Sequence, residues 1–141
     1  MVKTPFYEGL SYQKKNQKNI NKSSFNNRQM KALFFIITGR ENPERFTLAL
    51  TIATRSAMNK RYDDLKVIFY GPGEEYLTSI NGQDLENFSY LLKNGHVDSA
   101  CVNYAASKNI KEQLTKLGVN LLPTGERLAY YVNQGYEVIS F

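Results

Sequence analysis

The stretch from Lys31 to Thr38 constrains the fold of this chain more than any other part of its sequence. Within it, Ala-Leu-Phe-Phe-Ile-Ile is a continuous apolar run that ends shortly before Gly39. A run of this kind is typical of a strand buried on both faces, which occurs mainly in parallel sheets that are covered by helices on both sides. We therefore expect a parallel sheet enclosed between helices, with Lys31 to Thr38 as its first strand.

A helix start signal follows this strand. Asn42 suits the N-cap position, Pro43 suits the first helical turn, and Glu44 suits the positive end of the helix dipole. Apolar residues then recur at helical spacing to about Lys60. The alternation continues to the end of the chain. Further strands are expected at 65–70, 97–102, 119–122 and 136–141, and further helices at 84–94, 107–117 and 125–133.

Strands that alternate with helices predict an α/β fold with a mostly parallel sheet. The number of strands and the length of the chain suggest a flavodoxin-like three-layer α/β/α sandwich with five strands. Residues 1–29 differ in composition, being rich in Asn, Lys, Gln and Ser, and their apolar residues keep no period. We expect a flexible basic leader at 1–29 and one α/β domain at 30–141.

The net charge of +5 is confined to the leader. Six basic side chains against one acidic side chain within residues 1–30 account for all of it, and the remaining twelve basic and twelve acidic side chains cancel. We therefore do not expect the folded body to bind nucleic acid. Any association through the leader would be salt-sensitive and blind to sequence.

The single cysteine, Cys101, excludes an intrachain disulfide framework and fits a reducing compartment. No apolar run approaches the ~20 residues that a membrane span needs, and the first residues lack the apolar core of a signal peptide. We expect a cytoplasmic protein that makes no membrane contact and holds no metal or cofactor.

The loops after the strands hold the candidate site residues, because ligands of open parallel sheets meet the carboxyl ends of the strands. Gly39 and Arg40 follow the first strand, Gly71 follows the second, and Asn103 follows the third. Arg40 would stabilise a thiolate or bind a thiosulfate-like anion near Cys101 if their strands were neighbours, and is otherwise a solvated loop charge. Gly71 either lets an anion approach the backbone closely or only makes a tight turn between a strand and the following helix.

Cys101 is the candidate nucleophile. It lies at the predicted end of a strand and shortly before a helix, where the helix dipole and free N–H groups favour the thiolate. The thiolate is the nucleophilic form of cysteine. The alternative is a small buried hydrophobic residue, which is how most free cysteines behave.

The other titratable residues give no catalytic pattern. His96, the only histidine, precedes the strand that Cys101 ends, so it is expected at the opposite side of the sheet as a solvated turn residue. The acidic pairs Asp63-Asp64 and Glu74-Glu75 lie beside loops and are expected on solvated faces.

Three segments share a pattern with one known family. They are Lys31 to Gly39 with Asn42-Pro43-Glu44-Arg45, Val97 to Ile110 around Cys101, and the ending Gly118 to Leu122 with Val138 to Phe141. In these segments the chain resembles the DsrE/DsrF/TusD-like family of sulfur-relay proteins. The resemblance implies a carrier whose cysteine, here Cys101, receives sulfane sulfur from a donor protein and passes it to a cysteine of an acceptor protein.

Two functions remain open. The first is a sulfur carrier, a possible sulfurtransferase, that holds sulfur on Cys101 as a persulfide or thiosulfonate. The second is a non-catalytic ligand-binding or assembly module on the same fold, in which Cys101 is buried and inert.

The resemblance also implies a homo-oligomer, and we expect a trimer or hexamer, with a dimer as the alternative. One small core should not accommodate all of the large apolar and aromatic side chains, so some should form an interface patch. The residues concerned are Tyr76, Leu77, Ile80, Phe88, Tyr90, Tyr104, Tyr130 and Tyr131.

Overall fold

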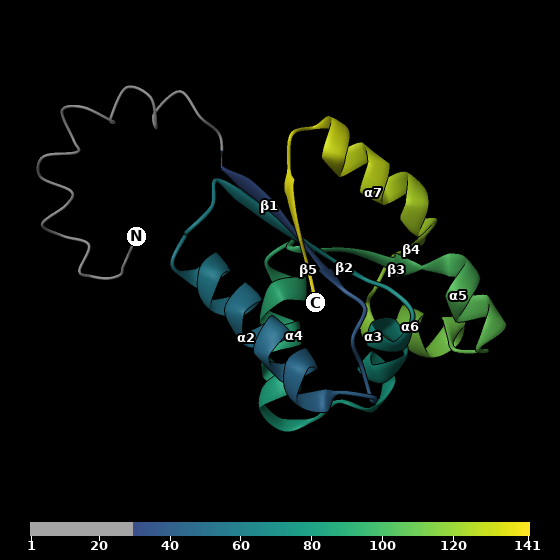
Figure 1. Ribbon diagram of the computed structural model, residues 1–141. Helices are drawn as coiled ribbons and strands as arrows, with labels where there is room; N and C mark the ends of the chain where they lie inside the picture. Colours follow the sequence, from purple (N-terminus) through teal and green to yellow (C-terminus); the bar gives the residue numbers. More distant parts are fainter. Residues whose placement is uncertain (1–29) are drawn as a thin grey trace, which may run out of the picture.

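Five parallel strands form the centre of the molecule, in the order β4-β3-β2-β1-β5 (Figure 1). The computed structural model describes residues 30–141, so the predicted leader at 1–29 lies outside the described residues. The strands are β1 (Lys31–Ile36), β2 (Asp64–Phe69), β3 (Val97–Cys101), β4 (Leu121–Leu122) and β5 (Glu137–Ser140). All four pairings between neighbouring strands are parallel.

Helices connect successive strands. These are α2 (Pro43–Met58) after β1; α3 (Pro72–Tyr76), the 3-10 turn η1 (Leu77–Ser79) and α4 (Gly82–Lys93) after β2; α5 (Val102–Ser107) and α6 (Lys111–Leu117) after β3; and α7 (Thr124–Asn133) after β4. The Asn42 side chain caps α2 as expected, accepting a hydrogen bond from the Arg45 N–H at 3.1 Å. None of the helices within 30–141 has both the length and the apolar character that a membrane crossing requires.

The order of the strands decides which helices share a face. The chain steps in one direction from β1 to β4 and then returns to the far edge of the sheet as β5. Because parallel crossovers are right-handed, this path places α2 and α4 on one face and α7 on the other, as Figure 1 shows. The predicted α/β class and the flavodoxin-like three-layer α/β/α arrangement are confirmed.

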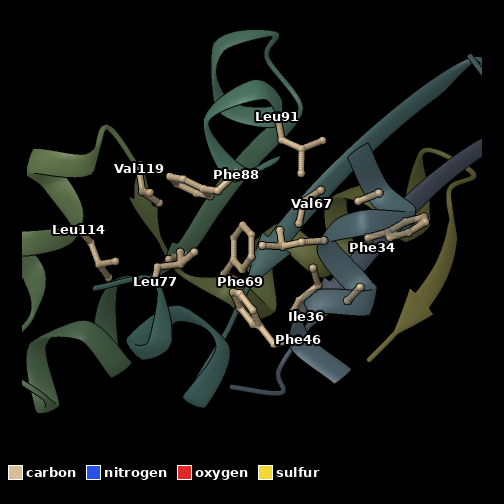
Figure 2. Packing of buried hydrophobic residues seen from close by; sticks show 14 of the residues in the cluster. Phe34, Ile36, Phe46, Val67, Phe69, Leu77, Phe88, Leu91, Leu114 and Val119 are labelled. Atoms are coloured by element: carbon tan, nitrogen blue, oxygen red, sulfur yellow. The ribbon is translucent and has the colours of Figure 1, made fainter. Parts of the chain in front are cut away.

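The face covered by α2 and α4 holds the main core. Alternate residues of β1 point toward it, as the period of two in a strand requires, and they meet the apolar stripe of α2. Phe69 lies at its centre, with ring centroids 6.3 Å from Phe46 and 5.8 Å from Phe88 (Figure 2). We call this side of the sheet the α2/α4 face.

The opposite side, the α7 face, has a much smaller apolar cluster. Its buried members are Leu33, Ile68 and Tyr131, and three partly buried residues, Phe35, Leu128 and Tyr136, pack against them. Only α7 covers this face among the described residues, so the sheet there is shielded less completely.

Two short helical segments are absent from the sequence prediction. The stretch Pro72–Ser79 folds as α3 and η1, and α5 begins directly after Cys101 rather than at Ser107. Both are too short to show a helical apolar period, which explains why periodicity missed them.

The eight large apolar and aromatic side chains named above are not all buried in one core. Leu77, Phe88 and Tyr131 are buried. Most of the others are half-buried, and Tyr130 alone of the eight is an exposed side chain, at 47 %. The buried ones divide between two apolar clusters, one on each face of the sheet, and an interface patch formed by the less buried ones stays a prediction.

Candidate functional site

Cys101 lies where the connections after two neighbouring strands diverge. It ends β3, serves as the N-cap residue of α5, and pairs with Leu122 at the end of β4. The chain after β3 continues to α5 and α6, whose buried residues join the core of the α2/α4 face, whereas the chain after β4 continues to α7 on the other face. In open α/β sheets, ligands bind in the crevice at such a topological switch point.

A cavity of about 600 Å³ opens at this point, and we call it the Cys101 cavity. Its walls come from the ends of β1, β2 and β3, from α5, and from the start of α7. The lining residues are Phe35, Tyr70, Cys101, Asn103, Tyr104, Pro123, Thr124, Gly125 and Leu128. A volume of this size with mostly apolar walls and a few polar groups is common among small-molecule sites.

The Cys101 thiol is in an environment that favours its ionised form. Only 6 % of the residue is exposed, and burial by itself would raise the pKa of the thiol. The backbone N–H groups of Tyr104, Thr124 and Asn103 and the Thr124 hydroxyl surround the sulfur, and together they lower its pKa below the ordinary value. Because the thiolate is the nucleophilic form of cysteine, this arrangement is of the kind that supports attack on an electrophile.

Thr124 is the second polar residue of the site. It is the first residue of α7, is 5 % exposed, and lines the same cavity as Cys101. Its hydroxyl oxygen is buried and makes no regular hydrogen bond with any of residues 30–141. A buried hydroxyl without a partner costs free energy, so this group is available to the sulfur or to a bound ligand.

Glu74 is a site residue that the sequence reasoning missed. The sequence places it on a solvated face, but the structure buries it completely. Its Oε1 accepts hydrogen bonds from the N–H groups of Gly71 and Cys101, each at 3.1 Å, and its Oε2 is buried without a partner among the described residues. Burial raises the pKa of this carboxyl to about 7, although the two N–H groups oppose the rise. A glutamate three residues after a turn glycine is the spacing of a capping box, and that signal could have found it.

The neighbouring Glu75 is also engaged at the site. The Tyr104 hydroxyl donates a hydrogen bond to Glu75 Oε1 at 3.2 Å, and the Tyr104 ring meets the Tyr70 ring edge to face at 6.3 Å. Burial and the Glu75 carboxylate together raise the pKa of Tyr104. Helix α3 therefore places two acidic residues in contact with residues of the Cys101 cavity.

Of the other four predicted site residues, the structure brings Asn103 alone to the Cys101 cavity. Arg40 is placed elsewhere, because β2 separates β1 from β3 and the strands are not neighbours as that expectation requires. Its Nη2 donates a hydrogen bond to Ser79 Oγ at 3.4 Å, and its guanidinium lies 6.0 Å from the Tyr76 ring centroid. It is thus no partner of the thiolate, and as an exposed side chain it fits the alternative of a solvated loop charge.

Gly39 and Gly71 shape the loops rather than line the cavity. A Cβ atom on Gly39 would come within 2.1 Å of the Pro72 carbonyl oxygen, so only glycine allows the two loops to pack this closely. Gly71 has φ +62°, a conformation that other residues rarely adopt, and this sharp turn directs Glu74 back toward Cys101.

A polar cluster attaches α7 to β3 beside the site. Arg127 binds Asp98 through two hydrogen bonds, at 3.0 Å from Nε and 2.8 Å from Nη2, and Tyr131 donates a third to Asp98 at 2.6 Å. Burial alone would raise the pKa of Asp98, but the hydrogen bonds from Arg127, Tyr131 and Ser99 lower it overall. Because Thr124 starts the same helix, this cluster also fixes the wall of the Cys101 cavity.

A second cavity of about 600 Å³ lies at the amino ends of the strands and includes His96 and Asp63. His96 lies at the opposite end of the strands from Cys101, as expected; it is half-buried, and its Nδ1 lies 2.8 Å from the Leu65 carbonyl oxygen. Asp63 accepts a hydrogen bond from the Met30 N–H at 3.0 Å, so it too is engaged. Within residues 30–141, no group of three or more metal-ligating side chains is present.

Comparison with known proteins places the fold but no activity. No model of a known protein family matches the chain, and no curated protein matches it. Among solved structures, a conserved protein of unknown function from Bacteroides thetaiotaomicron, BT1422, is similar with a TM-score of 0.66 and 19 % sequence identity. The match covers 79 % of this chain and 94 % of that chain, and at this identity it shows that the two proteins share a fold.

Proposed function

We propose that this protein is a sulfur carrier, in which Cys101 accepts a sulfane sulfur and passes it to an acceptor thiol. One observation carries the proposal: the only thiol of the chain lines a cavity at a switch point of the sheet, with three N–H groups and a hydroxyl around its sulfur. These groups stabilise negative charge on the sulfur, both in the thiolate and in a persulfide. The likeness of the segment Val97 to Ile110 to sulfur-relay proteins points in the same direction.

The partners in this proposal are a sulfur donor and a sulfur acceptor, and the protein itself acts in the cytoplasm as a homo-oligomer. Exposed apolar side chains on the outer surface of α2 support an assembly of subunits: Leu48 is 55 %, Ile52 is 43 % and Met58 is 53 % exposed. A trimer or hexamer follows from the family resemblance. Sedimentation at micromolar concentration should show a species larger than the 16.2 kDa monomer, and a clean monomer would remove this part of the proposal.

The alternative function, a ligand-binding module with an inert cysteine, has one observation in its favour. Cys101 is only 6 % exposed, as a structural cysteine would be. The two functions differ in whether the native thiol reacts.

Intact mass measurement separates these two functions. Native protein is incubated with a polysulfide, and bound sulfur atoms are counted before and after addition of an acceptor thiol. The carrier should gain sulfur and then lose it to the acceptor. Because the chain has one cysteine, Cys101→Ser should gain none, which makes it a complete control. Labelling that occurs only after denaturation would support the inert module and refute the carrier.

A further inference from the structure

The walls of the Cys101 cavity indicate which sulfur donor it takes, an inference that rests on the proposed sulfur-carrier function. Among the described residues that line the cavity, none carries a formal charge apart from the thiolate itself. Most of the surface comes from aromatic and aliphatic side chains, with Phe35, Tyr70 and Leu128 on the side of the α7 face. An apolar wall binds apolar groups by removing them from water and offers an anion nothing to replace its hydration.

The charges nearest to the cavity also oppose an anion. Glu75 accepts the hydrogen bond of the Tyr104 hydroxyl, and Glu74 accepts that of the Cys101 N–H. Because burial raises the pKa of Glu74 to about 7, its carboxyl is only partly ionised at neutral pH, and Glu75 is the main acidic group beside the cavity. Lys108 is exposed, and its Nζ lies 5.7 Å from the centroid of the Tyr104 ring. Arg127 is paired with Asp98, and Arg40 does not line the cavity. The local field therefore disfavours thiosulfate and any other multiply charged donor.

Thr124 supplies the remaining polar contact. Its buried hydroxyl makes no regular hydrogen bond within residues 30–141 and, in the wall of the same cavity, is available both to the thiolate and to a ligand. One hydroxyl and a few backbone N–H groups suit the small polar end of a persulfide, whereas a sulfonate would require several donors for its three oxygens.

We propose that the Cys101 cavity selects the protonated, uncharged form of an organic persulfide, R–S–SH, whose apolar or aromatic group R occupies the space between Phe35, Tyr70 and Leu128. The Cys101 thiolate attacks the terminal sulfur of R–S–SH, the S–S bond of the donor breaks, and its electron pair leaves with R–S⁻. The products are Cys101–S–SH and the donor thiolate, so no oxidant or reductant is needed. The carried species is a persulfide and not a thiosulfonate.

Alkylation tests the charge preference without any sulfur chemistry. Iodoacetamide and iodoacetate have nearly the same shape, and only iodoacetate is charged. Relative to a free cysteine, Cys101 should prefer iodoacetamide by about tenfold, the effect of one unit charge roughly 10 Å away at an effective dielectric constant of about 20. Equal relative rates for the two reagents would overturn the inference.

A matched pair of variants localises the effect. Asn103→Arg places a cation at the exposed rim of the Cys101 cavity, and Asn133→Arg makes the same change at the exposed far end of α7. Asn103→Arg should reduce the preference for iodoacetamide several-fold, and Asn133→Arg should leave it unchanged. The same reduction in both variants would mean that net charge, and not the cavity, determines the preference.

Sulfur donors then separate this inference from the function on which it rests. Benzyl persulfide should load Cys101 faster than glutathione persulfide, and thiosulfate should load it least, as measured by intact mass. Loading from thiosulfate at the rate of benzyl persulfide would overturn the selectivity but leave the carrier function intact. No loading from any donor would refute the carrier, while the alkylation rates would still decide the charge preference of the cavity.

Discussion

The two faces of the sheet differ in what holds them together. On the α2/α4 face, fully buried aromatic and aliphatic side chains form a continuous core in which Phe69 packs between Phe46 and Phe88. On the α7 face, three buried residues suffice, and the helix is also attached by the polar contacts of Asp98 with Arg127 and Tyr131. The stable face provides the scaffold, and the less completely covered face leaves room for the Cys101 cavity.

The largest effect should come from opening the core of the α2/α4 face. Phe69→Ala should lower the free energy of unfolding by about 3–5 kcal/mol, because the rings of Phe46 and Phe88 cannot fill the space. Phe35→Ala on the α7 face should cost less, about 1–2 kcal/mol, since Phe35 is only partly buried. Urea unfolding followed by circular dichroism measures the free energy of unfolding of both variants. Equal losses of stability in the two variants would show that the two faces contribute equally to the stability of the fold.

Removing the polar attachment of α7 should have an intermediate effect. Asp98→Asn should cost about 1–3 kcal/mol at neutral pH, discounted for solvent screening because the Arg127 side chain is 29 % exposed. The pKa of Asp98 is lowered in the folded state, so its contribution is present above the unfolded pKa, about 3.9, and is lost as the pH falls through the folded value. Thermal unfolding should therefore show that the difference in melting temperature between wild type and Asp98→Asn becomes smaller as the pH falls through this range.

A milder variant checks this attachment. Tyr131→Phe keeps the ion pair and removes one hydrogen bond to Asp98, so it should cost about 0.5–1.5 kcal/mol. A loss as large as that of Asp98→Asn would mean that packing of the tyrosine ring, and not the charge, anchors α7.

An effect that appears only as a dependence on pH concerns Glu74, whose carboxyl accepts a hydrogen bond from the Cys101 N–H. The pKa of its carboxyl is about 7 in the folded protein, against an ordinary value of 4.5. The folded state therefore holds a proton that the unfolded state releases between these values, and wild-type stability falls as the pH rises through this window. The amide side chain of Glu74→Gln does not titrate. The free energy of unfolding of this variant, relative to that of wild type, should therefore rise by roughly 1–3 kcal/mol between pH 5 and pH 8.

Chemical denaturation at several pH values measures this difference. The Gln amide buries an additional hydrogen-bond donor without a partner, and this lowers the free energy of unfolding of the variant by an amount that does not depend on pH. Only the change with pH in the difference between the two free energies of unfolding is therefore informative. A difference that stays constant with pH would mean that Glu74 stays ionised in the folded protein.

Local sequence signals predicted the site only in part. Cys101 ends a predicted strand and Asn103 follows it, and the structure places both at the same cavity. Arg40 follows a strand just as clearly, but whether it meets Cys101 depends on strand order, which no local pattern contains. Thr124 and Glu74 were not singled out because hydroxyl and carboxyl groups are mostly solvated, and only the packing of distant segments shows that these two are buried.

The sequence by itself determined the alternation of strands and helices, the buried first strand, the cap at Asn42, and the position of Cys101 at the end of a strand. These features arise from interactions within a few residues, such as apolar periodicity and capping, and they can be identified without the fold. Only the tertiary structure decided that β3 and β4 are neighbours with their connections on opposite faces, so that Thr124 meets the Cys101 thiol. It also decided the burial of Glu74, because the order of strands and the burial of polar groups depend on contacts between residues far apart in the chain.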